Sequence, residues 1–242
     1  MASIVETLLF PFTRASRADS QEVRVPELPP AIMEQVDWYV AADYPEKILL
    51  SEGGKLTKDE YIWDMAHVLQ RLMKGVKEED LERDRVLVID PRVALDVALG
   101  SFEVPCPELN LNCVEDFHEG PEKQSYPYLF ILRDLPWFIK PTDRSNLIGI
   151  AQGFPGFYPE GLTAREAAIY IKLHPELGEQ HISNYFVGSR YGKCHFVMQT
   201  TNHHDQAELM RASAADVVQY GRVPLGIRVY DKPNHFPFQK TH

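Results

Sequence analysis

The sequence predicts an α+β protein, in which a mostly helical acidic region precedes a C-terminal domain with the element order β-α-β-β-α-β. Three observations predict this class. Capping motifs that begin helices occur in both halves of the 242-residue chain. Runs rich in β-branched and aromatic residues alternate with helical patterns in the C-terminal half. The hydrophobic residues, 44% of the chain, are enough for a substantial core.

The net charge of −10 is unevenly distributed. Residues 1–143 hold 15 Lys+Arg and 27 Asp+Glu, a balance of −12, whereas residues 144–242 hold 10 and 8, a balance of +2. Proteins that coat nucleic acid neutralise phosphates with basic side chains, so the overall charge argues against that mode of binding. We therefore expect any anion-binding surface in the C-terminal part.

The cysteines and the hydropathy pattern predict a soluble intracellular protein without membrane contact. Cys106, Cys113 and Cys194 lack CxxC spacing, and we interpret them as free thiols. The longest apolar runs are far too short to cross a bilayer. Arg14 and Arg17, with nearby Ser and Thr, also fit a weak mitochondrial presequence, which stays open as an alternative location.

The first elements follow from proline positions and helical spacing. Residues 1–30 end in a proline-dense stretch, which predicts an extended arm. Helical spacing over residues 32–40 ends near Pro45, because the residue before a proline avoids the α conformation. A short strand is expected over residues 47–50. Thr57 and Glu60 then form a capping box, which begins an amphipathic helix.

The rest of the N-terminal region is predicted from shorter signals. The β-branched run at 85–89 indicates a buried strand, and residues 93–99 indicate a short helix closed by Gly100. Residues 101–126 mix Pro, Asn and acidic residues and are interpreted as a connection. Residues 31–125 are thus predicted to form an acidic, mainly helical region.

The C-terminal domain is placed at residues 126–242, with its core at 147–232. The first predicted elements are a strand over 147–152 and a helix capped by Thr163 and Glu166. Strands over 182–187 and 194–199 follow. A second helix, capped by Asn202 and Asp205, carries Leu209 and Met210, and a strand over 225–230 completes the domain. Such a unit packs both helices on one face of its sheet and leaves the other face open.

Local sequence in this domain resembles the quasi-RRM branch of the RNA-recognition-motif family, as found in the heterogeneous nuclear ribonucleoproteins F and H. The resemblance lies in AQGFP at 151–155, YGKCHFVM at 191–198 and PLGIRVYDKP at 224–233. LFILRDLPWF at 129–138 is similar to the first strand of the same branch and competes with 147–155 for that place. The resemblance implies a ferredoxin-like, RRM-like fold over about 90 residues.

The chain departs from ordinary members of this family on the sheet surface. They stack bases on aromatic side chains of strands one and three, where this chain has Ile150, Lys193 and His195. In the quasi-RRM branch the edge loops bind instead. The matching loops combine aromatic and cationic residues, as unpaired bases and phosphates require. The resemblance therefore implies an RNA-binding set of Phe154, Phe157, Tyr158, Arg190, Tyr191, Lys193 and His195.

Motifs that would carry catalysis or hold a metal ion are not found in the sequence. His203 and His204 are adjacent and would lie about 100° apart on a helix, which favours a helix start over a metal site. Cys194 and His195 would point to opposite faces of a strand. We therefore predict no catalytic residue, no metal site and no cofactor.

The sequence thus predicts a non-enzymatic RNA-binding or scaffold subunit of an RNA-processing assembly. Its RRM-like domain would contact single-stranded RNA through edge loops, and its acidic region would bind protein subunits of a larger complex. Two alternatives stay open. The first is a protein–protein interaction module with a degenerate RRM fold and no RNA binding. The second is a ferredoxin-like enzyme or small-ligand binder of the dimeric α+β-barrel kind, with His195 lining its cavity.

Overall fold

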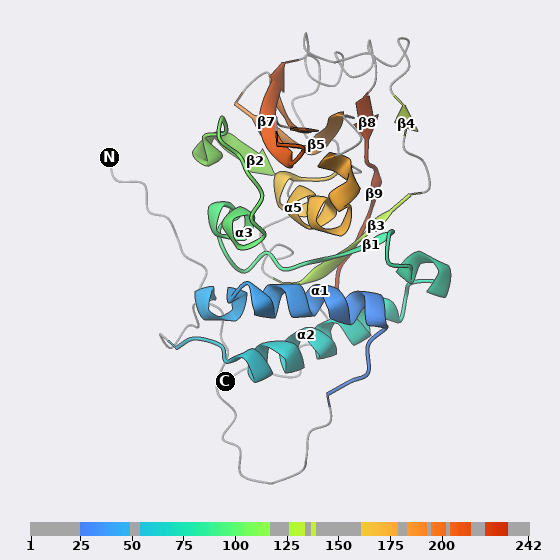
Figure 1. Ribbon diagram of the computed structural model, residues 1–242. Helices are drawn as coiled ribbons and strands as arrows, with labels where there is room; N and C mark the ends of the chain where they lie inside the picture. The colour runs from blue at the N-terminus through green and yellow to red at the C-terminus, as the bar shows by residue number, and fades with distance from the viewer. Residues whose placement is uncertain are drawn as a thin grey trace, which may run out of the picture.

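The described part of the chain forms a mixed α+β fold with two sheets (Figure 1). The computed structural model describes residues 25–48, 54–116, 126–133, 137–138, 161–178, 183–192, 195–201, 204–213 and 221–231. Its α-helices are α1 (Pro30–Ala41), α2 (Lys58–Met73), α3 (Leu95–Ser101) and α5 (Ala164–Leu173). Short 3-10 turns lie at Tyr44–Lys47 (η1), Glu78–Leu81 (η2), Leu111–Cys113 (η3) and Pro175–Gly178 (η5).

The two longest helices of the N-terminal region begin as their sequences predict. Pro30 occupies the first turn of α1, where its missing N–H group is not needed. The capping box of α2 is confirmed: Thr57 Oγ1 accepts from the Glu60 N–H at 3.2 Å, and the Glu60 carboxylate accepts from the Thr57 N–H at 3.0 Å. The strand expected over 47–50 is not formed by its described residues, because Lys47 belongs to η1.

A three-stranded antiparallel sheet lies against these helices. Its strand order is β1 (Val86–Ile89), β3 (Tyr128–Leu132) and β9 (Gly226–Val229). The predicted strands at 85–89 and 225–230 are confirmed, and the 128–132 strand lies at the centre of this sheet. Because β1 comes from one predicted region and β3 and β9 from the other, the two regions share a sheet.

The second sheet has six strands and contains the long hairpin of the C-terminal part. Its strands are β2 (Val114–Asp116), β4 (Trp137–Phe138), β5 (Ser183–Tyr191), β6 (His195–Thr201), β7 (Ala207–Ser213) and β8 (Gly221–Val223). The main order is β4-β8-β5-β6-β7, and β2 pairs with the end of β5. All pairs are antiparallel except β5 with β8.

The prediction of a second helix in the C-terminal domain is wrong for the part of it that the structure describes. Residues 207–213 form strand β7, which pairs with β6 along its whole length. Leu209 packs in the main core while its neighbour Met210 packs on the opposite face, an alternation typical of a strand. Asp205 has a φ of 56°, which suits a turn and not a helix cap. Three antiparallel strands therefore follow α5, and a ferredoxin-like arrangement is not confirmed.

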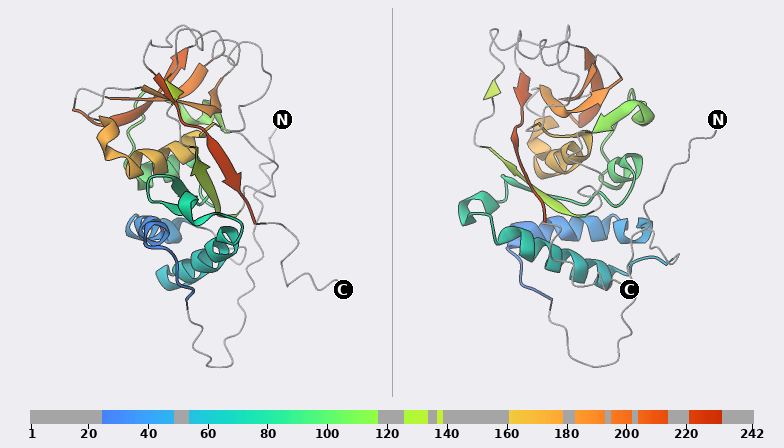
Figure 2. Two further views of the ribbon diagram at one scale, coloured as in Figure 1. Left: turned by 90° about the vertical axis from the view of Figure 1, so that its right-hand side faces the viewer. Right: turned by 180° about the vertical axis from the view of Figure 1, so that it is seen from behind.

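Helix α5 lies between the two sheets and organises the packing of the molecule (Figures 1 and 2). Its capping box of Thr163 and Glu166 is confirmed. Figure 2 shows the layers in order: α1 and α2, the three-stranded sheet, α5, and the six-stranded sheet. Almost every residue of α5 is buried, as expected of a helix covered on two sides.

Candidate functional site

The end of the β5–β6 hairpin holds the described members of the predicted RNA-binding set. Arg190 and Tyr191 are the last residues of β5, and His195 begins β6 opposite Tyr191. The turn between these strands is shorter than the predicted one, because β5 continues to Tyr191. Phe154, Phe157, Tyr158 and Lys193, and the side chain of His195, lie outside the described residues.

Strand β2 brings an acidic side chain to this end of the hairpin. Glu115 of β2 is the register partner of Arg190, and it is exposed. Opposite charges on directly paired residues of neighbouring strands attract each other, so Glu115 reduces the positive potential that Arg190 would offer to a phosphate. No local pattern predicts this neighbour, because β2 is short and Glu115 lies 75 positions before Arg190 in the chain.

Tyr191 contributes to packing at the same place. Its ring is partly buried against the main core, and its hydroxyl group accepts from the Asn110 N–H at 3.4 Å. A base needs an exposed aromatic face for stacking. The ring of Tyr191 is only partly available for that purpose.

Side chains on both faces of the six-stranded sheet are buried. Towards α5, the buried residues are Phe186, Val197 and Leu209, which belong to the main core. On the opposite face, a second cluster is formed by Tyr185, Val187, Met198, Ala212 and Val223. The open sheet face that the predicted fold would offer is therefore absent over these residues.

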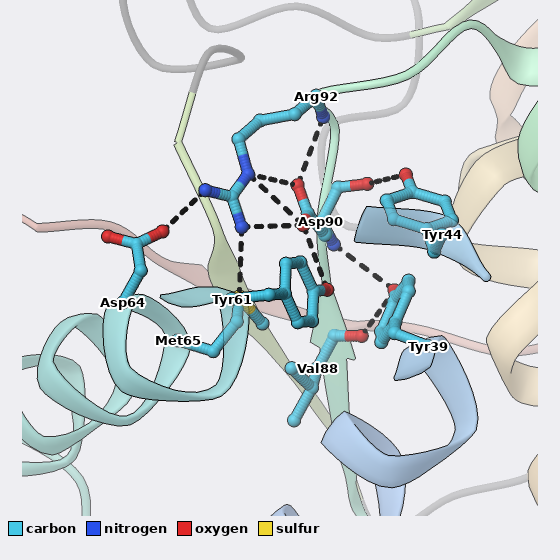
Figure 3. A network of polar contacts seen from close by, with 8 residues as sticks. All are labelled: Tyr39, Tyr44, Tyr61, Asp64, Met65, Val88, Asp90 and Arg92. Carbon is cyan, nitrogen blue, oxygen red and sulfur yellow. Dashed lines mark hydrogen bonds and ion pairs between the residues drawn. The ribbon is translucent and has the colours of Figure 1, made fainter. Parts of the chain in front are cut away.

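A buried polar network surrounds Asp90, which directly follows β1 (Figure 3). Asp90 is 1% exposed. Its carboxylate accepts from Arg92 Nε at 2.9 Å, from Arg92 Nη2 at 2.8 Å and from the Tyr61 hydroxyl at 3.0 Å. Arg92 Nη1 donates to Asp64 at 2.5 Å. The network thus places one guanidinium between two carboxylates.

Two further tyrosines connect this network to α1 and η1. The Tyr39 hydroxyl donates to the Val88 carbonyl at 2.9 Å and accepts from the Asp90 N–H at 3.1 Å. The Tyr44 hydroxyl donates to the Asp90 carbonyl at 2.6 Å. Burial, and then the Asp90 charge, raise the pKa values of Tyr39, Tyr44 and Tyr61 well above the ordinary one. The three hydroxyl groups therefore stay neutral donors.

The Asp90 network holds elements together. Burial works against the charged form of Arg92, but the Asp90 and Asp64 carboxylates outweigh it and raise the pKa of Arg92. None of the nitrogen and oxygen atoms of its side chains is both buried and without a hydrogen-bond partner. The network joins α1, η1 and α2 to the end of β1, and its saturated groups favour a structural role.

A second buried ion pair joins α5 to the three-stranded sheet. Arg228 donates to both carboxylate oxygens of Glu166 at 2.6 Å, and the Tyr128 hydroxyl donates to Glu166 Oε1 at 2.8 Å. Burial opposes the charge of Arg228, but Glu166 raises its pKa above the ordinary value. The capping motif predicts for Glu166 only a role at the start of the helix. Glu166 lies buried beside Tyr128 and Arg228. This position depends on the pairing of β3 with β9, which are distant in the sequence.

Comparisons with other proteins do not add a family to these observations. No protein-family model matches the chain, and the searches of curated proteins and of solved structures find no match. Within the described ranges, no group of three His, Cys, Asp or Glu side chains could hold a metal ion. None of the described helices combines the length and hydropathy needed to span a membrane.

Proposed function

We propose that this protein is a non-enzymatic binding module that docks a basic segment of a partner protein. The observation that carries the proposal is the burial of the described core side chains on both faces of the six-stranded sheet, which leaves those residues no open surface for stacking bases. Glu115 opposite Arg190 supports the same preference for protein over RNA. This proposal follows the first of the two alternatives that the sequence left open.

Charge supports a basic partner. The described residues 25–48 and 54–116 hold 9 Lys+Arg and 19 Asp+Glu, a balance of −10. Such a region repels phosphates and attracts basic protein segments. The acidic region is therefore the preferred place for the interaction.

An exposed aromatic anchor lies within this region on α2. Trp63 is 42% exposed. The centroid of its ring lies 4.1 Å from the centroid of the His67 ring, one turn further along the helix. Asp59, one turn before Trp63, is exposed, and the described residues offer it no ion-pair partner. Tryptophan is enriched among the residues that dominate protein interfaces, and its face binds cationic side chains. We assign the docking surface to Asp59, Trp63 and His67.

The test is quantitative affinity purification with crosslinking, using the full chain. The double variant Asp59→Lys with Trp63→Ala should lose basic partners that the wild type retains. Glu108→Lys makes the same charge change at an exposed loop residue and serves as the control. Circular dichroism should show that both variants are folded. Equal recovery of crosslinked partners by the wild type and the double variant would rule out this surface.

RNA contact through the edge loops stays a prediction from the sequence. It can be tested with the same full-length protein. Filter binding of single-stranded RNA at physiological salt should show no appreciable affinity. Tight binding that Arg190→Ala with Lys193→Ala weakens, together with a flatter salt dependence, would contradict the protein-docking proposal and support the RNA site.

A further inference from the structure

Strand β1 lies at one edge of the three-stranded sheet, where β3 is its neighbour on one side only. Its odd-numbered residues direct their backbone groups to β3, as the 2.7 Å bond from the Leu132 N–H to the Arg85 carbonyl shows. The backbone groups of Val86, Val88 and Asp90 therefore point away from the sheet. Such an edge is a template on which another strand can pair.

Side chains of α1 bond to this edge as a fourth strand would. Gln35 Nε2 donates to the Val86 carbonyl at 2.7 Å, and Gln35 Oε1 accepts from the Val88 N–H at 2.8 Å. The Tyr39 hydroxyl repeats this pattern one step further along, because it donates to the Val88 carbonyl and accepts from the Asp90 N–H (Figure 3). A residue of a parallel neighbouring strand makes the same pair of bonds.

The spacing of the two side chains along α1 matches the spacing of the strand. Gln35 and Tyr39 are four residues apart, which is about 6 Å along a helix axis. The outward-facing residues of β1 are two positions apart, which is roughly 6.6 Å along a strand. One face of α1 can therefore serve successive positions of the edge.

The cover is complete over the outward-facing groups of β1 and Asp90. The Val86 N–H donates to the Glu82 carbonyl at 3.3 Å, and the Asp90 carbonyl accepts from the Tyr44 hydroxyl of η1 at 2.6 Å. The three side chains that bond to the edge are all buried. Since unsatisfied buried backbone groups are costly, α1 cannot separate from β1 without leaving a row of unpaired donors and acceptors.

Strand β1 has the composition of a segment that pairs with other chains when its edge is open. Val86–Ile89 is an uninterrupted apolar run without glycine or proline, and all four of its residues are buried. Exposed edges of this kind lead to association between chains. Two copies of β1 would offer each other the same row of donors and acceptors in an antiparallel pair. A second copy is therefore the partner that the cover excludes.

We propose that α1 and η1 are a built-in substitute for a fourth strand, which keeps β1 from pairing with a second copy of this chain. Gln35 and Tyr39 are the residues that close the edge. This inference concerns self-association and does not rest on the docking surface of α2.

The test compares full-length variants by sedimentation velocity over a range of protein concentrations. Gln35→Leu with Tyr39→Phe removes the hydrogen bonds of both side chains to the edge and keeps apolar groups in their places. This double variant should self-associate with a constant at least about tenfold above that of the wild type. Val197→Ala, which truncates a fully buried side chain of the six-stranded sheet, is the control and should sediment as the wild type does.

Hydrogen exchange of residues 86–90 identifies the surface involved. In dilute solution, the Val88 and Asp90 amides of the double variant should exchange at least about tenfold faster than in the wild type, because their acceptors are lost. At high protein concentration their protection should return, which association through another surface would not produce. Circular dichroism shows whether the variants are folded. If the double variant is not, Tyr39→Phe alone retains the ring and allows the same comparison.

Three results would overturn the proposal. The first is sedimentation of the Gln35 and Tyr39 variants that matches the wild type at every concentration. The second is equal self-association of Val197→Ala, which would make general destabilisation the cause. The third is an exchange rate of residues 86–90 that does not respond to the substitutions or to association.

Discussion

Asp90 and Arg92 show how much of this fold depends on single polar side chains. Both are almost completely buried, and together with Asp64 and Tyr61 they close the junction between β1 and the first two helices (Figure 3). The sequence indicates a strand that ends before Asp90-Pro91, but it does not reveal that this aspartate is buried. An Asp and an Arg two residues apart are usually solvated, and the packing of α1, η1 and α2 around the end of β1 excludes water here.

Replacing Asp90 should therefore strongly lower the free energy of unfolding. Asp90→Asn leaves Arg92 buried with only Asp64 as a counter-charge, and removing one member of a buried pair costs roughly 3–5 kcal/mol of the free energy of unfolding. Urea denaturation measures the loss. Glu82→Gln, which breaks the exposed pair with Arg85, is the control and should cost no more than about 1 kcal/mol. A loss of less than about 1 kcal/mol for Asp90→Asn would contradict the role given to the network.

At the level of elements, local signals predicted the helices well and the strands less well. The capping boxes of α2 and α5 were predicted correctly, because a capping box is complete within four residues. Strand β7 was predicted as a helix, because AELMRAS has no strong preference and its pairing with β6 decides its conformation. The central position of β3 likewise depends on β1 and β9, which are far away in the sequence.

The contact between β5 and the segment before α5 depends on two glycines. The Gly188 N–H donates to the Leu162 carbonyl at 2.9 Å, and a Cβ atom at Gly188 would lie 2.4 Å from the carbonyl oxygen of Gly161. Gly188 is therefore required for close approach of two backbones. This contact holds the amino end of α5 against the six-stranded sheet.

The substitution Gly188→Ala tests this contact. Because the clash is with backbone atoms, the free energy of unfolding should fall by about 1–3 kcal/mol or more. Gly100→Ala is the matched control: no atom lies within 4 Å of its added Cβ, and alanine in a helix should add roughly 0.5–1 kcal/mol. Chemical denaturation of both variants gives the comparison. Similar changes in the two would show that the close approach is unimportant.

For the whole molecule, the three-stranded sheet makes the predicted regions interdependent. A chain of residues 126–242 alone would lack β1 and also α1 and α2, so one face of β3 would lose its cover. We expect this fragment not to unfold cooperatively in a thermal melt followed by circular dichroism. A chain that begins at residue 25 keeps every described element and should unfold cooperatively. A cooperative transition of the 126–242 fragment would restore the division into separate domains.

The pairing of β9 with β3 also determines the order in which the protein can fold. Leu129 pairs with Val229, one hundred positions later, and folding rates fall as such distant contacts increase. During synthesis, Glu166 is made long before Arg228, and its carboxylate has no cationic partner to compensate its burial until β9 arrives. The nascent chain should therefore keep α5 loosely packed until β9 leaves the ribosome, and a chaperone would meet it in that state.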